Sequence, residues 1–276
     1  DYWTVSFSSL NGRMYVERGN RRRSLIPQYN FGDYEFVSLF SGGLDSLIGV
    51  IDELTNVPND KKGILISHFD WTYKGPNNDQ NRIIGKFQNH FSDKFTHLRC
   101  RVGLNNVDNN GDSISRDTNQ RSRSILFLGI GSFIVNAVPN LNTLLLPENG
   151  TISLNHPLTP SRSSSLSTRT THPYFIKKIQ EVFGQVGLSV QLYNPFSFST
   201  KGEMVINCSD SIVLNDTFND SVSCGKRGHK VNWTNRNARQ CGVCMPCIYR
   251  RASLHKLNLD NEVYGKDLLN HHNPIN

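Results

Sequence analysis

The chain has 276 residues, of which 37% are hydrophobic, and it carries a formal net charge of +7. This apolar content suffices for a sizeable core and excludes an intrinsically disordered chain, and no stretch approaches the roughly 20 apolar residues that a membrane span needs. The positive charge favours an anionic partner, although a mildly basic surface that serves only solubility is the alternative. The chain begins with Asp1 rather than methionine, so we expect its natural start to lie upstream.

Strands and helices are predicted to alternate along most of the chain. Residues 2–19 come first and alternate apolar and polar side chains around Asn11-Gly12, a strong signal for a type I′ β-hairpin. Arg21–Arg23 follow the hairpin. We then predict strands over residues 34–40, 61–69, 96–102, 142–150 and 189–196, and helices over residues 45–54, 81–91, 121–138, 172–187 and 201–208. The strands are near-continuous apolar runs, so the expected fold is α/β with an open parallel sheet covered on both faces.

The stretch Ser41-Gly-Gly-Leu-Asp-Ser46 joins the first of these strands to the first helix. Ligands of open parallel sheets bind beyond the carboxyl ends of the strands, which is where this stretch is predicted to lie. Glycines let the backbone turn tightly and approach a ligand, and the start of the following helix attracts anions. With the serine hydroxyls added, the stretch predicts a cradle for phosphate groups.

Asp45 needs a separate explanation, because a carboxylate repels a bare phosphate. It either caps the helix or holds a metal ion that accompanies the phosphates. The plainer alternative for the whole stretch is a glycine-containing turn with a serine or aspartate as the helix cap. We expect Asp45 and Ser46 to lie on the surface edge of the sheet, so that substitutions there change stability little.

Six cysteines are present, and four of them gather near the C-terminal end: Cys224, Cys241, Cys244 and Cys247. A secreted disulfide protein usually spreads its cysteines through the chain, so this clustering indicates a metal site and a cytoplasmic location. Four thiolates suit a closed, tetrahedral, structural zinc site. An iron–sulfur cluster and a set of buried reduced cysteines are the two alternatives.

The string from Ser41 to Ser46 resembles the PP-loop of the N-type ATP pyrophosphatases, which share the HUP, or adenine nucleotide alpha hydrolase-like, fold. It is not a Walker A loop, because no Gly-Lys-Ser/Thr follows. Together with the Cys-X2-Cys-X2-Cys pattern from Cys241 to Cys247, it resembles the QueC-like, or 7-cyano-7-deazaguanine synthase, family. Residues 121–128 and 194–205 are also similar to segments of that family, and the resemblance covers roughly residues 36–257.

The resemblance implies an ATP-dependent ligase that forms a C–N bond. Members of the family adenylate the carboxylate of 7-carboxy-7-deazaguanine, release pyrophosphate and pass the acyl group to ammonia. The implied cofactors are ATP, Mg²⁺ and Zn²⁺. The implied organisation is an N-terminal hairpin extension over residues 1–33, a PP-loop domain over residues 34–222, and a zinc-binding helical segment over residues 223–276 packed on the same core.

The chain departs from the family where the substrate segment is expected. Residues 161–173 read SRSSSLSTRTTHP, whereas the family has a Tyr-Pro-Asp-Cys-Arg-like segment. The hairpin and Arg21–Arg23 are also additions. These features look closer to the QatC proteins of the Qat antiphage defence system, and related QueC-like defence proteins are thought to join a deazaguanine to a protein amine. We therefore expect a protein partner from a defence operon and no membrane association.

Three other functions remain open. The chain could be a genuine cyanodeazaguanine synthase that uses ammonia. It could be a tRNA-modifying PP-loop adenylase, with Arg21–Arg23 on nucleic-acid phosphates, which makes nucleic acid a secondary partner. It could also be a nucleotide-binding scaffold without turnover.

The resemblance also implies roles for individual residues. The loop residues that should hold the β and γ phosphates are Ser41, Gly42, Gly43, Leu44, Asp45 and Ser46, with Asp45 and Ser46 counted as catalytic. Lys201, at the predicted start of a helix, would neutralise charge between the α and β phosphates during reaction. Its alternative is a solvated surface lysine.

The remaining candidates concern the base and the substrate. His68 would border the adenine, and Arg123 the α-phosphate. Arg121, Glu148 and Arg169 would bind the substrate, Arg169 through a bidentate pair with its carboxylate and Glu148 through the N–H groups of a guanine-like edge. The alternatives are plain packing for His68, solvated arginines, and a turn residue for Glu148.

Overall fold

The computed structural model describes residues 31–68, 74–102, 110–113, 123–154 and 171–266. The predicted hairpin, Arg21–Arg23, Arg121, Arg169 and most of the substrate segment therefore lie outside the described residues. The chain divides into two compact units, Asp1–Phe31 and Gly32–Asn276.

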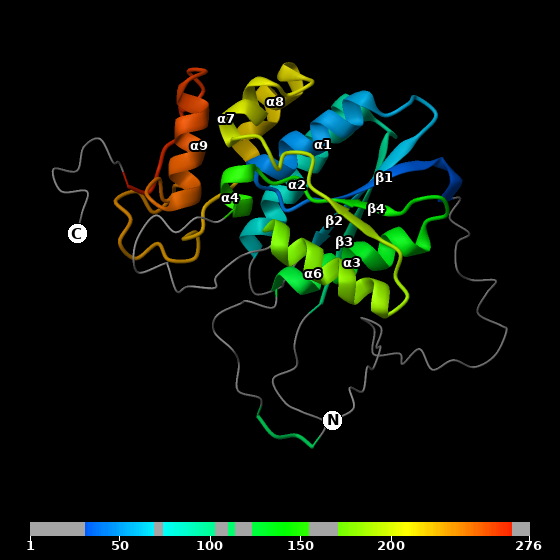
Figure 1. Cartoon of the computed structure of the whole chain (residues 1–276). Coiled ribbons are helices and arrows are strands. Elements are labelled where there is room, and N and C mark those ends of the chain that lie inside the picture. The colour runs from blue at the N-terminus through cyan, green and yellow to red at the C-terminus, as the bar shows by residue number, and fades with distance from the viewer. Residues whose placement is uncertain (1–30, 69–73, 103–109, 114–122, 155–170, 267–276) are drawn as a thin grey trace. The chain divides into compact units, whose positions relative to one another are not determined.

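The second unit contains a five-stranded sheet in which all pairs of neighbouring strands are parallel (Figure 1). The strands are β1 (Tyr34–Leu39), β2 (Lys62–His68), β3 (Phe95–Cys100), β4 (Thr143–Leu145) and β5 (Gln191–Tyr193), in the order β3-β2-β1-β4-β5. The predicted α/β fold with an open parallel sheet is thus confirmed. β4 and β5 are shorter than predicted, since pairing stops where the chain turns toward the loops that follow.

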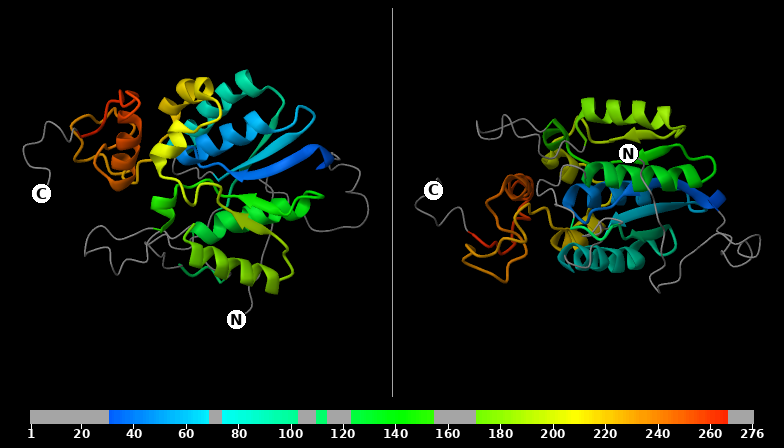
Figure 2. Two further views of the ribbon diagram at one scale, coloured as in Figure 1. Left: turned by 45° about the horizontal axis from the view of Figure 1, so that its top comes forward. Right: turned by 90° about the horizontal axis from the view of Figure 1, so that it is seen from below.

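Helices cover both faces of this sheet (Figures 1 and 2). The longer ones are α1 (Leu44–Asn56), α2 (Lys74–Phe91), α3 (Arg123–Ala137), α6 (Pro173–Gln185) and α9 (Met245–His255). The shorter ones are α4 (Gly150–Leu154), α7 (Lys201–Ile206), α8 (Ser211–Thr217) and the 3₁₀ turns η1 (Phe31–Asp33) and η2 (Phe218–Asp220). None of the described helices combines the length and hydropathy needed to cross a bilayer.

The alternation of side chains along β1 separates two apolar layers. Phe36 and Phe40 belong to a core that also contains residues of α1, α2, α7, α8 and α9. Leu144 of β4 faces the other layer, where it packs so closely on Gly131 of α3 that a Cβ there would lie 2.4 Å from it. The first turns of α2 were not predicted, because residues 74–80 are polar and lack an apolar period.

The close packing of α1 makes Gly49 a sensitive position. A Cβ on Gly49 would lie 2.4 Å from Cβ of Pro147, which follows β4, and the rigid proline ring cannot yield. We expect Gly49→Ala to lower the free energy of unfolding by about 1–3 kcal/mol in urea denaturation. The control is Gly85→Ala in α2, where a Cβ would meet nothing within 4 Å. That change should stabilise by about 0.5–1 kcal/mol, and equal effects of the two changes would contradict the packing described.

Candidate functional site

The loop from Ser41 to Ser46 connects the carboxyl end of β1 to the start of α1. Gly42 has a φ of +81°, a conformation that glycine adopts without strain. Gly43 is the N-cap of α1, and as a glycine it has no side chain to cap the helix. Asp45 lies in the first turn instead, so the alternative in which Asp45 serves as the cap is wrong.

Serine hydroxyls accept hydrogen bonds from two backbone N–H groups of the loop. The Gly43 N–H donates to Ser41 Oγ at 3.2 Å, and the Leu44 N–H donates to Ser223 Oγ at 3.3 Å. Ser46 Oγ lies 3.0 Å from Ser41 Oγ and donates to the Gly43 carbonyl at 3.0 Å. Amides and hydroxyls of this kind can bind phosphate oxygens at helix starts, and phosphate binding by the loop stays a prediction.

Asp45 is buried and forms an ion pair with Lys201, the first residue of α7. Its second oxygen accepts a hydrogen bond from Asn149 Nδ2 at 2.7 Å. Only 7% of Asp45, 5% of Ser46 and 4% of Lys201 is exposed. The expectation that Asp45 and Ser46 lie on the surface edge is therefore wrong, and so is the alternative of a solvated Lys201. Removing one charge alone should be costly, because it leaves the other buried without a partner.

A capping box fixes the position of Lys201. The Glu203 N–H donates to Thr200 Oγ1 at 3.2 Å, and the Thr200 N–H donates to Glu203 Oε2 at 2.7 Å. This reciprocal pair sets the start of α7, so Lys201 enters the site from a defined helix terminus.

Glu148 lies beside the Asp45–Lys201 pair, just beyond β4. Asn194 holds its backbone, since the Glu148 N–H donates to Asn194 Oδ1 at 3.3 Å and Asn194 Nδ2 donates to the Glu148 carbonyl at 2.8 Å. Burial, followed by the negative charge of Asp45, raises the pKa of Glu148 to about 8. At neutral pH Glu148 therefore keeps its proton, although the positive charge of Lys201 opposes this shift.

His68 and Arg123 are the two remaining candidates among the described residues, and both lie against Phe127 of α3. His68 ends β2, where its Nε2 lies 2.8 Å from the Val102 carbonyl and its ring centroid lies 5.5 Å from that of Phe127. The Arg123 guanidinium lies over the same Phe127 ring at 5.6 Å. Neither residue touches the loop in these contacts, and their nucleotide roles stay predictions.

Sequence reasoning missed three residues that complete the site: Gln80, Asn149 and Ser223. Gln80 Nε2 donates to the Ser41 carbonyl at 3.1 Å, and its buried Oε1 has no partner among the described residues. A buried oxygen without a partner can accept a hydrogen bond from a water molecule bound to a metal ion. Gln80 and Asp45 are therefore chemically suited to a metal ion that accompanies phosphate groups. Asn149 follows Glu148 in the sequence, and Ser223 precedes Cys224. Their positions next to these two candidates were the only features of the sequence that could have indicated them.

The four clustered cysteines converge on one point. Their sulfurs all lie within 4.8 Å of one another, and none forms a disulfide. The separations are 3.8 Å for Cys241–Cys247, 3.4 Å for Cys244–Cys247 and 4.0 Å for Cys224–Cys244. Four sulfurs arranged tetrahedrally around an ion at the Zn–S distance of about 2.3 Å would lie about 3.8 Å apart, so these thiols could hold a metal ion.

Backbone N–H groups point at two of these sulfurs. Cys224 Sγ accepts from the N–H groups of Lys226 at 3.4 Å and Cys241 at 3.3 Å. Cys241 Sγ accepts from those of Val243 at 3.4 Å and Cys244 at 3.2 Å. Hydrogen bonding with Cys224 also lowers the pKa of Cys241 and of Cys244, the latter to about 6. Such donors stabilise thiolates, which are the form that binds metals.

Charged side chains attach the cysteine segment, residues 223–266, to the helices that cover the sheet. Arg227 and Arg239, from that segment, both pair with Asp79 of α2, which is 2% exposed. Arg250 of α9 is fully buried, and it donates to the Phe218 carbonyl at 2.8 Å and pairs with Glu262 at 2.9 Å. The cysteines are therefore anchored to the same core that carries the loop.

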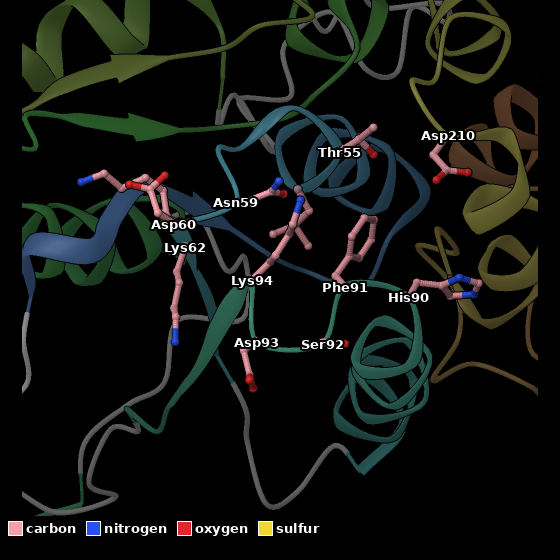
Figure 3. A pocket seen from close by; sticks show the side chains of 12 residues that line it. Thr55, Asn59, Asp60, Lys62, His90, Phe91, Ser92, Asp93, Lys94 and Asp210 are labelled. Carbon is pink, nitrogen blue, oxygen red and sulfur yellow. The ribbon is translucent and has the colours of Figure 1, made fainter.

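A cavity of about 520 Å³ lies at the opposite edge of the sheet (Figure 3). It is lined by residues at the end of α1, before and at the start of β2, and around the end of α2, among them Thr55, Lys62, His90 and Lys94. None of its lining residues belongs to the loop or the cysteine cluster. The candidate site is therefore defined by its side chains, not by this cavity.

Comparisons with known proteins assign no family. No protein-family model and no curated protein matches the chain. One solved structure with a similar fold is a U34-tRNA thiolase, NcsA from Methanococcus maripaludis, with its 4Fe-4S cluster. The identity is 13% and the TM-score 0.38, over 67% of this chain and 59% of that chain. This chain thus matches less than two thirds of the thiolase, and similarity at this level assigns neither family nor substrate.

If the four clustered cysteines bind a metal ion, replacing one of them should lower the metal content of the protein. Cys244→Ser should lower the bound metal measured by elemental analysis of the purified protein, and it should lower the melting temperature, because the remaining thiolates are left crowded and incompletely charge-balanced. The control is Cys208→Ser, a partly buried cysteine outside the cluster, which should keep the metal. A Cys244→Ser protein with full metal content and unchanged stability would contradict the assignment of these ligands.

The raised pKa of Glu148 predicts how the stability of the protein depends on pH. Its pKa is about 8 in the folded chain against 4.5 for an ordinary glutamate, so the folded protein keeps a proton that the unfolded chain releases. The stabilisation from that proton is complete below about pH 4.5 and is lost as the pH rises through about 8. Glu148→Gln stays neutral throughout, so its free energy of unfolding should fall less between pH 5 and pH 8.5 than that of the wild type, by roughly 1 kcal/mol or more.

Urea denaturation at several pH values measures this difference. Glu181→Gln is the control, because Glu181 is exposed on α6 and its pKa is lowered by Lys178. If Glu148→Gln and the wild type lose stability in parallel over this range, Glu148 does not hold the proton.

Proposed function

We propose that the protein is a QueC-like, ATP-dependent enzyme that adenylates the carboxylate of a 7-deazaguanine and transfers the acyl group to an amine of a partner protein. The observation that carries the proposal is the buried pair of Lys201 and Asp45 at a Ser-Gly-Gly-X-Asp-Ser loop. A lysine and an aspartate 156 residues apart meet at the start of the helix that follows this loop. ATP pyrophosphatase chemistry needs both phosphate donors and a cation at that place.

The reaction has two balanced steps. An oxygen of the substrate carboxylate attacks the α-phosphorus of ATP, the bond from that phosphorus to the oxygen bridging to the β-phosphate breaks, and pyrophosphate leaves. The amine nitrogen then attacks the acyl carbon, AMP leaves, and the amine loses a proton. No nucleophile from the protein is required, so the protein's contribution is alignment and charge stabilisation.

The described residues can supply these contributions. The Gly43 N–H and the hydroxyls of Ser41 and Ser46 would bind the departing pyrophosphate. Lys201 would stabilise the negative charge that develops between the α and β phosphates. Asp45 and Gln80 would hold Mg²⁺ and its waters, and the ion would supply charge neutralisation on the phosphates.

Glu148 supports the choice of a guanine-like substrate. It lies beside the ion pair, and its carboxyl group can accept from the ring and exocyclic N–H groups of such an edge once it is ionised. His68 and Arg123 for the nucleotide, and Arg121 and Arg169 for the acid, complete the proposed set by resemblance alone.

The metal proposed for the four cysteines is zinc in a structural role. Four thiolates leave no open position for chemistry, which is the pattern of structural zinc. Iron in the purified protein would instead favour a cluster, and with it the tRNA-modifying alternative. The proposed location is the cytoplasm, where a reducing setting keeps clustered thiols available for a metal.

The proposed acceptor is the N-terminal amino group of a partner protein. Residues 161–173 differ from the substrate segment of ammonia-using enzymes, and they are polar and basic. An α-amino group has a pKa of about 7.7–8.0, so an appreciable fraction is free amine at neutral pH, unlike lysine.

Incubation with ATP, Mg²⁺, 7-carboxy-7-deazaguanine and candidate partner proteins, followed by mass spectrometry, tests this function. We expect AMP, pyrophosphate and a partner that gains the mass of the acyl group only when all components are present. Efficient nitrile formation with ammonium, and no mass gain on any partner, would identify a cyanodeazaguanine synthase instead. No AMP under any condition would leave the scaffold alternative.

Variants of the Asp45–Lys201 ion pair distinguish a loss of AMP formation from a loss of stability. Asp45→Asn and Lys201→Met each leave one buried charge unpaired and should lower stability, whereas the double variant removes both charges and should recover most of it. AMP formation should stay roughly 10²–10³-fold reduced in all three, by analogy with the loss of an oxyanion donor. Lys178→Gln, an exposed ion-paired lysine of α6, is the control and should keep full turnover. A double variant with wild-type turnover would place the chemistry elsewhere.

A further inference from the structure

We propose that Ser223, supplied by the cysteine segment, is a phosphate-binding residue of the loop. This inference rests on the proposed function, since it assigns a further residue to the same nucleotide site. It concerns a residue that lies outside the Ser41–Ser46 string and immediately before the first clustered cysteine.

Ser223 reaches the loop through its side chain. Its Oγ accepts the Leu44 N–H at 3.3 Å, and that amide belongs to the first residue of α1. This bond satisfies one of the first N–H groups of the helix, which lack partners within it, and it brings Ser223 Oγ to the end of the helix where anions bind.

The hydroxyl hydrogen of Ser223 distinguishes it from the other serines at the loop. Ser46 donates to the Gly43 carbonyl and lies against Ser41, so both take part in bonds within the loop. No bond in which Ser223 Oγ donates is found within the part of the chain that the structure describes. A hydroxyl that accepts from the helix and has its own hydrogen available can donate to a phosphate oxygen at the same place.

The backbone around Ser223 is held on both sides. The preceding residue, Val222, donates its N–H to the Gly42 carbonyl at 3.0 Å. The Ser223 N–H donates to Oε1 of Gln240, which is 2% exposed and precedes Cys241. The distance of that bond is 3.1 Å. Ser223 is thus fixed between the loop and the cysteine cluster.

In this arrangement the cysteine segment also positions Ser223 next to the loop. Cys224 follows Ser223 directly, and its sulfur accepts from the Cys241 N–H at 3.3 Å. A metal ion held by these cysteines would fix the chain that carries Ser223, so that the segment positions a phosphate donor opposite the loop.

Calorimetric binding of three probes to the metal-containing full chain tests the proposal: α,β-methylene ATP, pyrophosphate and AMP. Ser223→Ala should weaken α,β-methylene ATP and pyrophosphate roughly 10-fold, the usual effect of losing a hydrogen bond to a charged group. AMP, which lacks the β and γ phosphates, should bind as before. Ser223→Thr keeps the hydroxyl and should stay within about threefold of the wild type.

Ser211→Ala is the matched control, because Ser211 is an exposed serine at the start of α8. If Ser223→Ala binds all three probes as the wild type does, the proposal is wrong while the nucleotide site stands. Equal weakening for AMP and pyrophosphate, or failure of the threonine to restore binding, would show a purely structural role and overturn it. If the wild type binds neither α,β-methylene ATP nor pyrophosphate, the proposed function itself fails and Ser223 loses its role with it.

Discussion

The buried ion pair between Asp45 and Lys201 is the interaction on which the loop's arrangement depends. Two charges removed from water are costly unless they meet in good geometry and their remaining polar atoms are satisfied. Asn149 satisfies the second oxygen of Asp45, and Glu148 keeps a proton so that a second negative charge does not crowd the site. The pair therefore fixes the relative positions of α1, α7 and the residues after β4.

Segments that are far apart in the sequence hold the residues around this ion pair in place. The capping box of α7 places Lys201, Asn194 holds the backbone of Glu148, and the chain before Cys224 closes over the start of α1. Each of these contacts comes from a loop at the carboxyl edge of the sheet, where ligands of open parallel sheets bind. A nucleotide with its cation would enter a site whose charges already balance, and Asp45 would exchange a lysine partner for a metal ion.

The sequence allowed the sheet, most helices and the cysteine cluster to be predicted, because apolar runs and cysteine spacing are local signals. It also drew attention to Lys201 and Glu148, which the structure brings together with Asp45. The burial of Asp45 was missed because a charged residue in a loop is normally solvated, and only a partner 156 residues away makes its burial tolerable. Asn149 and Ser223 were missed because their contacts depend on β4 lying next to β1 and on the return of the chain from η2 to the loop.

Carboxylate-dependent exchange of labelled pyrophosphate into ATP would establish the proposed adenylation, since it reports the first step without any acceptor amine. We expect exchange that requires Mg²⁺ and 7-carboxy-7-deazaguanine and that disappears when the carboxylate is replaced by an amide. Release of ADP and phosphate, or no exchange from a protein that binds ATP, would contradict cleavage between the α and β phosphates.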